Sequence, residues 1–349
     1  MDWNFLMDTV RDGRCVLLLG PEVAKTASGQ SFRQAFAESL DLVNNPLIAS
    51  YYDKEELFLF PDAIAKTRIY YQLKAFYQQD FQREFYGKLA RLPLKLFINA
   101  SPDSFLADTL GTAKHHFDYF HKTDPREEVS QPSLEKPLVY NLLGALEEEE
   151  SLLMTHDDLY EFLEAMLARQ HLPRKLTDEI FAARSLVFLG FNFDKWYVQL
   201  LLRLLKVHDV RSRFARFATE QKYNADTLSI CEEQFKIEFI NNGVDGFLDE
   251  LYQRCETENL LRELSTAAQS PKEQILQHIE ADQMNAAIDR MKGLFEAQDK
   301  DLFNEVIGIS ARHNRLKNRL NRNVIDEERG SVEMSRIRES LLELSEEII

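Results

Sequence analysis

Short apolar runs of strand length alternate with longer amphipathic segments over most of the chain before residue 250. We expect strands at residues 15–20, 94–99, 137–144, 151–155, 185–191, 213–218 and 236–241. Strands that alternate with helical segments form a mostly parallel sheet that is covered by helices on both faces. The pattern therefore predicts an α/β fold of the doubly wound kind.

Three segments between the expected strands carry further predictions. Residues 64–92 are rich in Tyr, Phe and Gln, so we expect a long helical stretch whose aromatic side chains pack into the core. His115, His116 and His121 are expected in another helix, at a spacing that is poor for a shared metal ion. Residues 123–136 combine Pro, Ser and charge, which is typical of an exposed loop.

The pattern changes after the last expected strand. Residues 246–264 predict a closing helix, and STAAQS at 265–270 precedes Pro271, which favours a linker. We therefore expect an α/β domain at 1–264, a linker at 265–270 and a small all-α domain at 271–349. The apolar residues at helical spacing in the last domain are Ile275, Ile279, Ile288, Met291, Phe295, Val306, Ile309, Leu316, Leu320, Ile337, Leu341, Leu344 and Ile348.

The composition agrees with two globular cores. A chain of 349 residues exceeds one ordinary domain, and 44% hydrophobic with 29% charged residues are globular values. No apolar run approaches the ~20 residues that span a bilayer, and the N-terminal MDWNFLMDTVRDGR lacks the basic and apolar regions of a signal peptide. We therefore expect a cytoplasmic protein without a membrane segment.

Charge and motif content argue against several function classes. A formal net charge of −16 repels a phosphate backbone, so we do not expect direct nucleic-acid binding. The sequence has no HExxH or CxxC pattern and its three cysteines are scattered, which argues against a metal site. A Ser/His/Asp hydrolase is not supported either, because no GxSxG elbow occurs.

The loop after the first expected strand is where doubly wound domains hold a pyrophosphate, with backbone N–H groups and a helix N-terminus. Here that loop begins at Gly20 and has the sequence GPEVAKTASGQSF. Pro21 has no N–H to donate, and Glu22 places a negative charge where phosphate oxygens would lie. The loop keeps the pattern of the fold, but we expect its phosphate binding to be weakened.

Five segments carry a resemblance to a known family through their order and spacing. They are GPEVA, INASPDSFL (98–106), VYNLLG (139–144), LLMTHDDLYEFL (152–163) and LVFLGFNFDKWYVQLLLRLL (186–205). Together they resemble a divergent branch of the sirtuin-like proteins of bacterial conflict and antiviral defence systems, over about residues 2–251. The resemblance implies a sirtuin-like, Rossmann-type fold with a site for NAD or an ADP-ribose-type nucleotide.

Three motifs of active members of that family are altered here. Those members have a Gly-Ala-Gly-x-Ser-like loop, a Thr-Asn-Tyr-Asp-like strand end whose Asn positions nicotinamide riboside and water, and a Leu-His-Gly-like strand end whose His is the base. When the sequence is aligned on Asp103, the Asn position is Ser101; when it is aligned on Gly144, the His position is Leu143. A leucine cannot accept a proton, so we expect the family's mechanism to be lost.

Ligands in such sheets bind beyond the carboxyl ends of the strands, which gives a set of candidate site residues. The candidates for nucleotide binding are Gly20, Pro21, Glu22, Ser101, Asp103, Gly144, Gly190 and Asn192. Asn99 also lies at a strand end. The candidates for replacement chemistry are Asn141, His156 and Asp157.

Most of these polar candidates also have a structural explanation. Asp103 suits a cap for the helix that follows it, and Thr155 with Asp157 or Asp158 resembles a helix start. His156 needs no catalytic explanation, because it is adequately explained as a surface histidine beside two aspartates. Asn141 either turns into the cleft or satisfies a loop carbonyl, and both alternatives stay open.

The C-terminal region carries a second resemblance. Its recognisable parts are ISARHNRL (309–316), the turn at 324–326 and the helix MSRIRESLLELSEEI (334–348). They resemble the small helical effector-associated domains of bacterial conflict systems, over roughly residues 271–349. In that family, such domains pair with a like domain on another protein and join a sensor or NTPase to an effector. We therefore expect a partner that carries a like domain, bound through residues 304–348.

Charges in the C-terminal region allow two interpretations. Residues 326–328 and 343–347 are acidic, and a basic helix face is formed by Arg312, Arg315, Lys317, Arg319 and Arg322. These faces are either solvated and paired locally, or they form a head-to-tail, self-complementary contact that gives a homo-oligomer.

Two functions from different classes follow from these observations. The first is a binding or scaffold component of a defence system, whose degenerate sirtuin-like domain binds a nucleotide or supports assembly. The alternative is an NAD glycohydrolase effector that uses non-standard catalytic residues. A protein deacetylase would need the same missing base, so we place it below both.

Overall fold

The structure is a computed structural model. The residues that it describes are 2–79, 81–117, 129–169, 172–205, 207, 214–219, 223–264, 275–276, 278–279, 283–295, 300–321 and 327–346. The chain divides into two compact units, Met1–Leu264 and Ser265–Ile349, which we describe separately. The linker expected at 265–270 lies outside the described residues.

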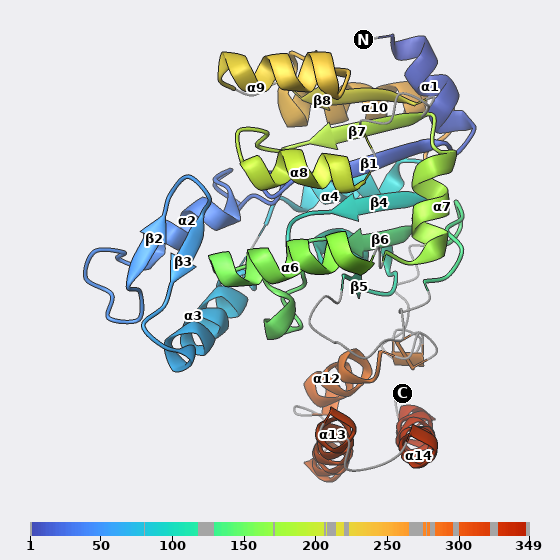
Figure 1. Ribbon diagram of the computed structural model, residues 1–349. Coiled ribbons are helices and arrows are strands. Elements are labelled where there is room, and N and C mark those ends of the chain that lie inside the picture. Colours follow the sequence, from blue (N-terminus) through green and yellow to red (C-terminus); the bar gives the residue numbers. More distant parts are fainter. Residues whose placement is uncertain are drawn as a thin grey trace. The chain divides into compact units, whose positions relative to one another are not determined.

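The first unit is built on one parallel sheet (Figure 1). Within the described residues, seven strands pair in parallel in the order β5-β6-β4-β1-β7-β8-β9. They are β1 (Cys15–Leu19), β4 (Leu96–Asn99), β5 (His115–His116), β6 (Leu138–Asn141), β7 (Ser185–Leu189), β8 (Ala215–Thr219) and β9 (Ile237–Ile240). The strand order reverses at β1, and doubly wound sheets bind ligands beside such a switch point. The predicted α/β fold is confirmed.

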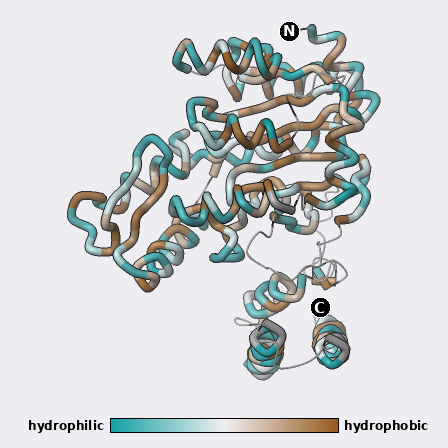
Figure 2. Tube along the Cα trace, viewed as in Figure 1, coloured by the Kyte–Doolittle hydropathy of each residue, from teal (hydrophilic) through white to brown (hydrophobic). Residues whose placement is uncertain are grey.

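The central strand β1 is buried on both faces of the sheet. Cys15, Leu17 and Leu19 join one hydrophobic cluster, whereas Val16 and Leu18 join another. Because successive side chains of a strand point to opposite faces, a strand covered on both sides needs an unbroken apolar run. This requirement explains the sequence CVLLL, and Figure 2 shows hydrophobic residues along the central strands.

Helices cover the two faces. The cluster around Leu17 takes side chains from α1 (Trp3–Arg11), α2 (Phe32–Ser39), α3 (Ala63–Phe76), α4 (Arg83–Arg91), α5 (Phe105–Leu110) and α10 (Gly243–Thr257). The cluster around Leu18 takes side chains from α6 (His156–Arg169), α7 (Arg174–Ala182) and α8 (Trp196–Leu204). A short helix, α9 (Ala225–Ser229), continues into a π-helical turn (Ile230–Gln234) whose Cys231 also joins the second cluster.

Six of the expected strands are confirmed, and the one expected at 151–155 is wrong. There the chain forms a 3₁₀ turn, Glu149–Ser151, followed by a buried loop. Ser151 Oγ accepts a hydrogen bond from the Ala145 N–H at 2.9 Å, and the Met154 carbonyl accepts one from the Phe58 N–H at 2.8 Å. The apolar run SLLM is therefore buried because it covers the core, without joining the sheet.

The helical stretch expected at 64–92 is confirmed, but it consists of two helices, α3 and α4. Between them, Phe81 makes a bridge with Thr26 and stacks on Phe105, with the ring centroids 4.0 Å apart. A continuous helix could not deliver this contact. The expectation that the aromatic residues pack into the core holds for Tyr70, Tyr77, Phe85 and Tyr86 but not for the exposed Tyr71.

The helix expected around the histidines is wrong as well. His115 and His116 form the edge strand β5 in register with Tyr140 and Asn141, while His121 lies outside the described residues. Of the loop expected at 123–136, residues 123–128 lie outside the described residues. Residues 129–136 have no regular structure, as expected, but Val129 is buried.

An antiparallel hairpin, β2 (Ser50–Tyr52) and β3 (Leu57–Leu59), was not predicted. Its strands are only three residues long, and its turn contains Asp53, Lys54 and Glu55 without a glycine. Hairpin turns are usually recognised by Gly or Asn at positions with positive φ. The sequence signal for this hairpin is therefore weak.

The second unit is helical, as expected. Its described helices include α12 (Met284–Phe295), α13 (Lys300–Asn321) and α14 (Glu327–Glu346). Their core contains Ile275, Ile279, Met284, Ala287, Ile288, Met291, Phe295, Val306, Ile309, Leu316, Ile337, Leu341 and Leu344. The predicted apolar positions are confirmed except for Leu320 and Ile348, whose side chains lie outside the described residues.

The contact between the ends of β1 and β7 requires a glycine at position 20. A Cβ there would lie 2.1 Å from the Gly190 carbonyl oxygen. We expect Gly20→Ala to lower the free energy of unfolding by about 3 kcal/mol, because backbone must shift to accept the methyl group. Denaturation followed by tryptophan fluorescence measures this change in the first unit, since both tryptophans, Trp3 and Trp196, lie there.

Gly87→Ala is the matched control. This glycine lies inside α4, and a Cβ would meet nothing within 4 Å. Removing a helical glycine should stabilise the unit by up to about 1 kcal/mol. Equal effects of the two substitutions would contradict the proposed contact.

Candidate functional site

A small cavity lies at the carboxyl ends of β4 and β6, where the sheet topology favours a ligand site. Its volume is about 60 Å³, well below the roughly 300–1,000 Å³ of a site for a small organic ligand. The residues that line it are Arg33, Phe36, Tyr51, Glu56, Leu57, Phe58, Leu73, Tyr77, Ala100, Pro102, Leu143, Leu152, Leu153, Met154, Leu159 and Tyr197. This cavity is therefore too small to hold a nucleotide.

The two substituted motif positions are both buried. Leu143, at the position of the family base, is 8% exposed and lines the cavity together with Leu152 and Leu153. Ser101, at the position of the family asparagine, is 2% exposed, and its hydroxyl has no hydrogen-bond partner. Apolar side chains thus fill the place where the family's proton acceptor would stand.

Two asparagines at neighbouring strand ends hold the loop after β4. Asn99 and Asn141 lie opposite each other in the sheet, and both side-chain amides donate to the Asp103 carbonyl, at 3.1 and 3.0 Å. The side-chain oxygen of Asn99, Oδ1, in turn accepts from the Ser101 N–H at 3.0 Å. Of the two alternatives for Asn141, the structure therefore favours the one in which it satisfies a loop carbonyl.

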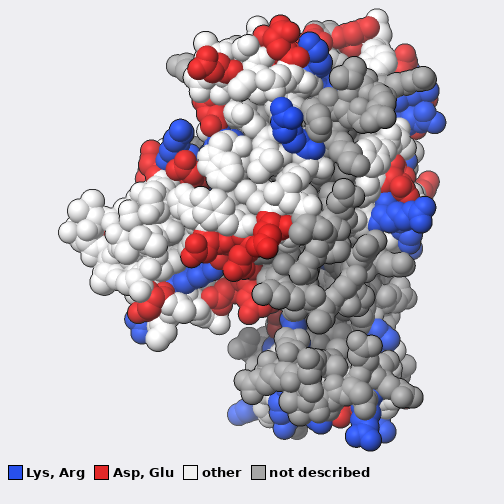
Figure 3. Space-filling model, viewed as in Figure 1, with Lys and Arg blue, Asp and Glu red and all other residues white. Residues whose placement is uncertain are grey.

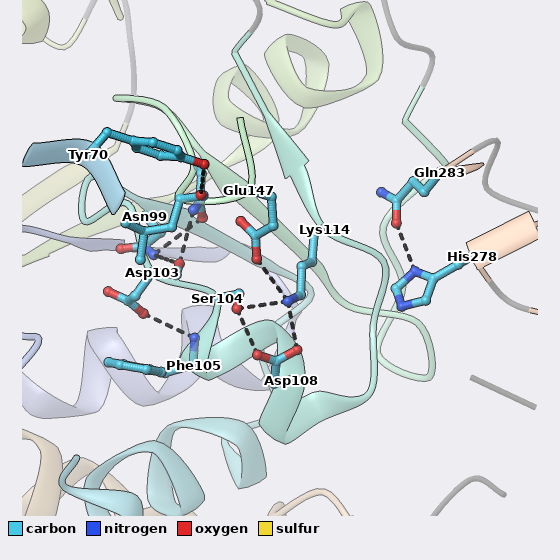
Figure 4. Close-up of polar contacts among 12 residues, drawn as sticks. Tyr70, Asn99, Asp103, Ser104, Phe105, Asp108, Lys114, Glu147, His278 and Gln283 are labelled. Atoms are coloured by element: carbon cyan, nitrogen blue, oxygen red, sulfur yellow. Dashed lines mark hydrogen bonds and ion pairs between the residues drawn. The ribbon is translucent and has the colours of Figure 1, made fainter. Parts of the chain in front are cut away.

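Asp103 stands at the start of α5 with its carboxyl group buried (Figure 4). One oxygen accepts a hydrogen bond from the Phe105 N–H at 3.1 Å, while the other is buried without a partner. Burial raises the pKa of this carboxyl to about 6, although the hydrogen bond from the Phe105 N–H acts in the opposite direction. The geometry agrees with the helix-capping role.

The loop after β1 uses its own backbone donors. The N–H groups of Gly20 and Glu22 donate to the carbonyls of Leu189 and Gly190, at 2.7 and 3.2 Å, and the Val23 N–H donates to Gly20. Pro21 has no N–H. The donors that would surround a pyrophosphate are therefore already engaged within the protein.

The other candidate glycines are also explained by close packing. Gly190 has φ +64°, and a Cβ there would lie 2.7 Å from a methyl group of Val23. Gly144 has φ +92°, and a Cβ there would lie 2.1 Å from the Ser151 carbonyl oxygen. Neither glycine requires a ligand to explain it. Together with the small cavity, these contacts do not fit the family's mode of NAD binding.

Three charged residues that were not predicted meet beside the cavity, and two of them, Arg33 and Glu56, line it. Lys195 Nζ lies 2.6 Å from Glu56 Oε2, and Arg33 Nη1 lies 3.5 Å from the same oxygen. They come from the segment before α8, from the β2–β3 hairpin and from α2. Their wide separation in sequence left no motif that would have revealed the cluster.

Asn192, predicted to bind a nucleotide, shapes the turn that leads to Lys195. Its side-chain oxygen accepts from the Asp194 N–H at 3.0 Å, and its carbonyl accepts from the Lys195 N–H at 3.3 Å. The hydrogen bonds of this asparagine are thus those of a turn that positions the lysine at the start of α8.

His156 and Asp157 lie at the start of α6, beside a separate open hollow of about 480 Å³. The helix is capped reciprocally: Asp158 accepts from the Thr155 N–H at 2.9 Å, and Thr155 Oγ1 accepts from the Asp158 N–H at 3.1 Å. The His156 ring packs on Tyr52 with centroids 4.6 Å apart, and Asp157 is exposed. Neither residue lines the cavity that contains Leu143.

Charged groups outside the cavity have structural roles. Lys114 Nζ lies 2.9 Å from Glu147 Oε1 and 3.1 Å from Asp108 Oδ1, which ties α5 to the loop after β6 (Figure 4). Burial opposes ionisation of Glu147, but the nearby lysine holds the pKa of this carboxyl below its usual value. Acidic side chains also gather in the region of α6 on the face shown in Figure 3, where Glu161 and Glu164 are exposed.

Two structural findings limit the possible sites. Among the described residues, no group of three or more His, Cys, Asp or Glu side chains could hold a metal ion. Of the helices in the described ranges, none has the length and apolar character that a membrane crossing requires.

Comparison with known families assigns the two units. A family model described as a SIR2-like domain matches residues 95–240, from the start of β4 to the end of β9. A second model, described as effector-associated domain 11, matches residues 270–349. The chain carries both domains. Together the SIR2-like domain and the effector-associated domain suggest a component of a conflict or defence system. No curated protein matches the chain.

The SIR2-like match includes Ser101, Asp103, Asn141 and Leu143 but not the loop after β1. The substituted motif positions therefore lie inside the matched region. The loop that would bind the pyrophosphate lies outside it. The two resemblances predicted from the sequence, one for each domain, are confirmed at the level of the family.

The buried Asp103 should make stability depend on pH in a specific direction. Because the folded protein raises this pKa from 3.8 to about 6, the folded state binds more protons between these values, and the free energy of unfolding falls as pH rises through them. Asp103→Asn removes the ionisation and keeps an acceptor for the Phe105 N–H. We expect the free energy of unfolding of this variant, relative to that of the wild type, to increase by about 2–3 kcal/mol between pH 4 and 7.

Denaturation followed by tryptophan fluorescence at several pH values measures this increase. Asp157→Asn is the control, because this aspartate is exposed and its substitution should give a difference that varies little with pH. An Asp103→Asn curve that is flat or falls with pH would show that the carboxyl is not held in an unfavourable environment.

Proposed function

We propose that this protein is a scaffold component of a bacterial conflict system. In this proposal the SIR2-like domain has lost the family's NAD hydrolysis and supports assembly. The effector-associated domain recruits a partner that carries a like domain and also supports a homo-oligomer in the cytoplasm.

The observation that carries the proposal is the position of Leu143. A leucine at the site of the family's base cannot accept a proton, and here it packs with Leu152 and Leu153 around a cavity of about 60 Å³. The engaged N–H groups of Gly20 and Glu22 support the same conclusion, because they are already bonded to carbonyls of the protein.

The alternative, an NAD glycohydrolase with replacement residues, gains less support from the geometry. Asn141 is buried and donates to the Asp103 carbonyl, whereas His156 and Asp157 lie beside a different hollow. A shared catalytic site would require these groups to converge on one ligand. The alternative therefore becomes an outcome of the experiment below.

Incubating the full-length protein with NAD and following proton NMR spectra over time tests the loss of activity. We expect no nicotinamide to be released, at protein concentrations high enough for self-association. Leu143→Ala serves as a matched variant, because it enlarges the cavity without supplying a base. Nicotinamide release by the wild type would contradict the proposal, and Asn141→Ala, His156→Ala and Asp157→Ala would then locate the replacement base.

Charge reversal on α13 tests the adaptor role. Arg312 and Arg315 are exposed one turn apart, whereas Arg319 lies 3.5 Å from Glu333 within the same unit. We therefore expect the double variant Arg312→Glu, Arg315→Glu to weaken self-association by about tenfold or more, because charged rims select partners. Analytical ultracentrifugation of the full chain measures the dissociation constant.

The control for this experiment carries the same change of charge elsewhere. Lys300 and Arg336 are exposed, at the start of α13 and on α14. Reversing both to Glu should leave the dissociation constant within about twofold of the wild type if the contact uses the face of Arg312 and Arg315. An equal loss in both double variants would indicate a general charge effect and reject this face as the contact.

A further inference from the structure

The side chain of Glu56 is held by two cations from separate elements. Lys195 is 5% exposed, and its Nζ lies 2.6 Å from Glu56 Oε2. Arg33 Nη1 lies 3.5 Å from the same oxygen. A buried ammonium group needs a close anion, because its transfer out of water is otherwise very unfavourable. The carboxylate of Glu56 supplies that anion.

The backbone at Glu56 is unusual for this residue type. Its φ is +58°, in the left-handed region, and its N–H donates to the Tyr52 carbonyl at 2.7 Å to close the hairpin turn. Glycine and asparagine are the residues that normally occupy such turn positions. The turn conformation does not favour a glutamate at this position. The contact of its carboxylate with the two cations explains why the residue is a glutamate.

The charges and donors around this carboxylate are not balanced. Two cations face one carboxylate, which leaves a net positive charge beside the cavity. Tyr77 lines the same cavity, is 4% exposed, and has a hydroxyl group without a hydrogen-bond partner. Buried polar groups are normally satisfied, so an unpartnered hydroxyl in the cavity that Arg33 also lines indicates that a further acceptor belongs there.

Tyr51 adds a second hydroxyl to the cavity wall. Burial, followed by the nearby Glu56 carboxylate, raises the pKa of Tyr51 to about 12, so this side chain remains a neutral donor at physiological pH. Two cations and two tyrosine hydroxyls are groups that recognise an oxygen-bearing anion.

We propose that Arg33 and Lys195 form a binding site for an oxyanion, either a phosphate or a carboxylate group, and that Glu56 is its built-in competitor. An incoming anion replaces the Glu56 carboxylate between the two cations and releases the β2–β3 hairpin from the cavity. No bond is made or broken in this exchange. The site requires no turnover of NAD, so it stands or fails separately from the scaffold function.

The experiment removes the competitor in two ways. Glu56→Gln keeps the shape of the side chain but lacks its charge, and Glu56→Gly also suits the positive φ, which protects the fold of the turn. Glu55→Gln, at the preceding position of the same turn, is the matched control. Thermal unfolding of each full-length variant is measured against inorganic phosphate and against acetate, with chloride at equal ionic strength as the reference.

We expect a saturable rise of the unfolding midpoint with phosphate, acetate or both in the two Glu56 variants. The apparent dissociation constant for the anion should be at least about tenfold lower in these variants than in the wild type or Glu55→Gln. In the latter two proteins the Glu56 carboxylate occupies the site and so reduces the apparent affinity for the anion. The anion that binds more tightly assigns the site to phosphate or carboxylate ligands. Adding Lys195→Met to Glu56→Gly should remove the saturable effect.

The proposal is overturned if neither Glu56 variant gains anion-dependent stabilisation beyond the chloride reference. It is also overturned if Glu55→Gln gains as much as the Glu56 variants, or if the effect survives Lys195→Met. Release of nicotinamide in the NAD experiment would reject the scaffold function but leave these results unchanged, so the two failures are distinguishable.

Discussion

The contact of Gly20 with Gly190 is the constraint on which the carboxyl end of the sheet, with its candidate site, depends. β1 and β7 are paired along their whole length, and the absence of side chains at these glycines lets the chain after β1 continue against the backbone after β7. In this close packing, the N–H groups of Gly20 and Glu22 donate to the carbonyls of Leu189 and Gly190. In a doubly wound fold the same groups would serve a phosphate, so close backbone packing and ligand binding compete for one set of donors.

A similar exchange has occurred at the ends of β4 and β6. Asn99 and Asn141 have polar groups suited to a ligand, but their side-chain amides donate hydrogen bonds to the Asp103 carbonyl instead. The loop that they fix places Asp103 in an apolar setting, where its carboxyl is difficult to ionise. Leu143 completes the change by filling the space with methyl groups. The polar groups of this region therefore hold the loop in place, and the cavity that remains is small.

Hydrophobic pattern predicted the sheet well, because strands buried on both faces leave long apolar runs such as CVLLL. The same signal failed for SLLM at 151–154, since burial beneath a hairpin produces an apolar run without strand pairing. Motif positions identified Ser101 and Leu143 from neighbouring residues. Arg33, Glu56 and Lys195 could not be found in this way, because only the folded chain brings α2, the hairpin and α8 together.

In the proposed scaffold function, the C-terminal domain makes the contact with a partner. The helical unit has a small core of its own, and small cores supply little stability, so surface contacts with a partner add proportionally more. The exposed Arg312 and Arg315 give that surface a positive charge. In the proposed adaptor role, the exposed arginines select the partner through charge, and the contact adds stability to a unit with a small core.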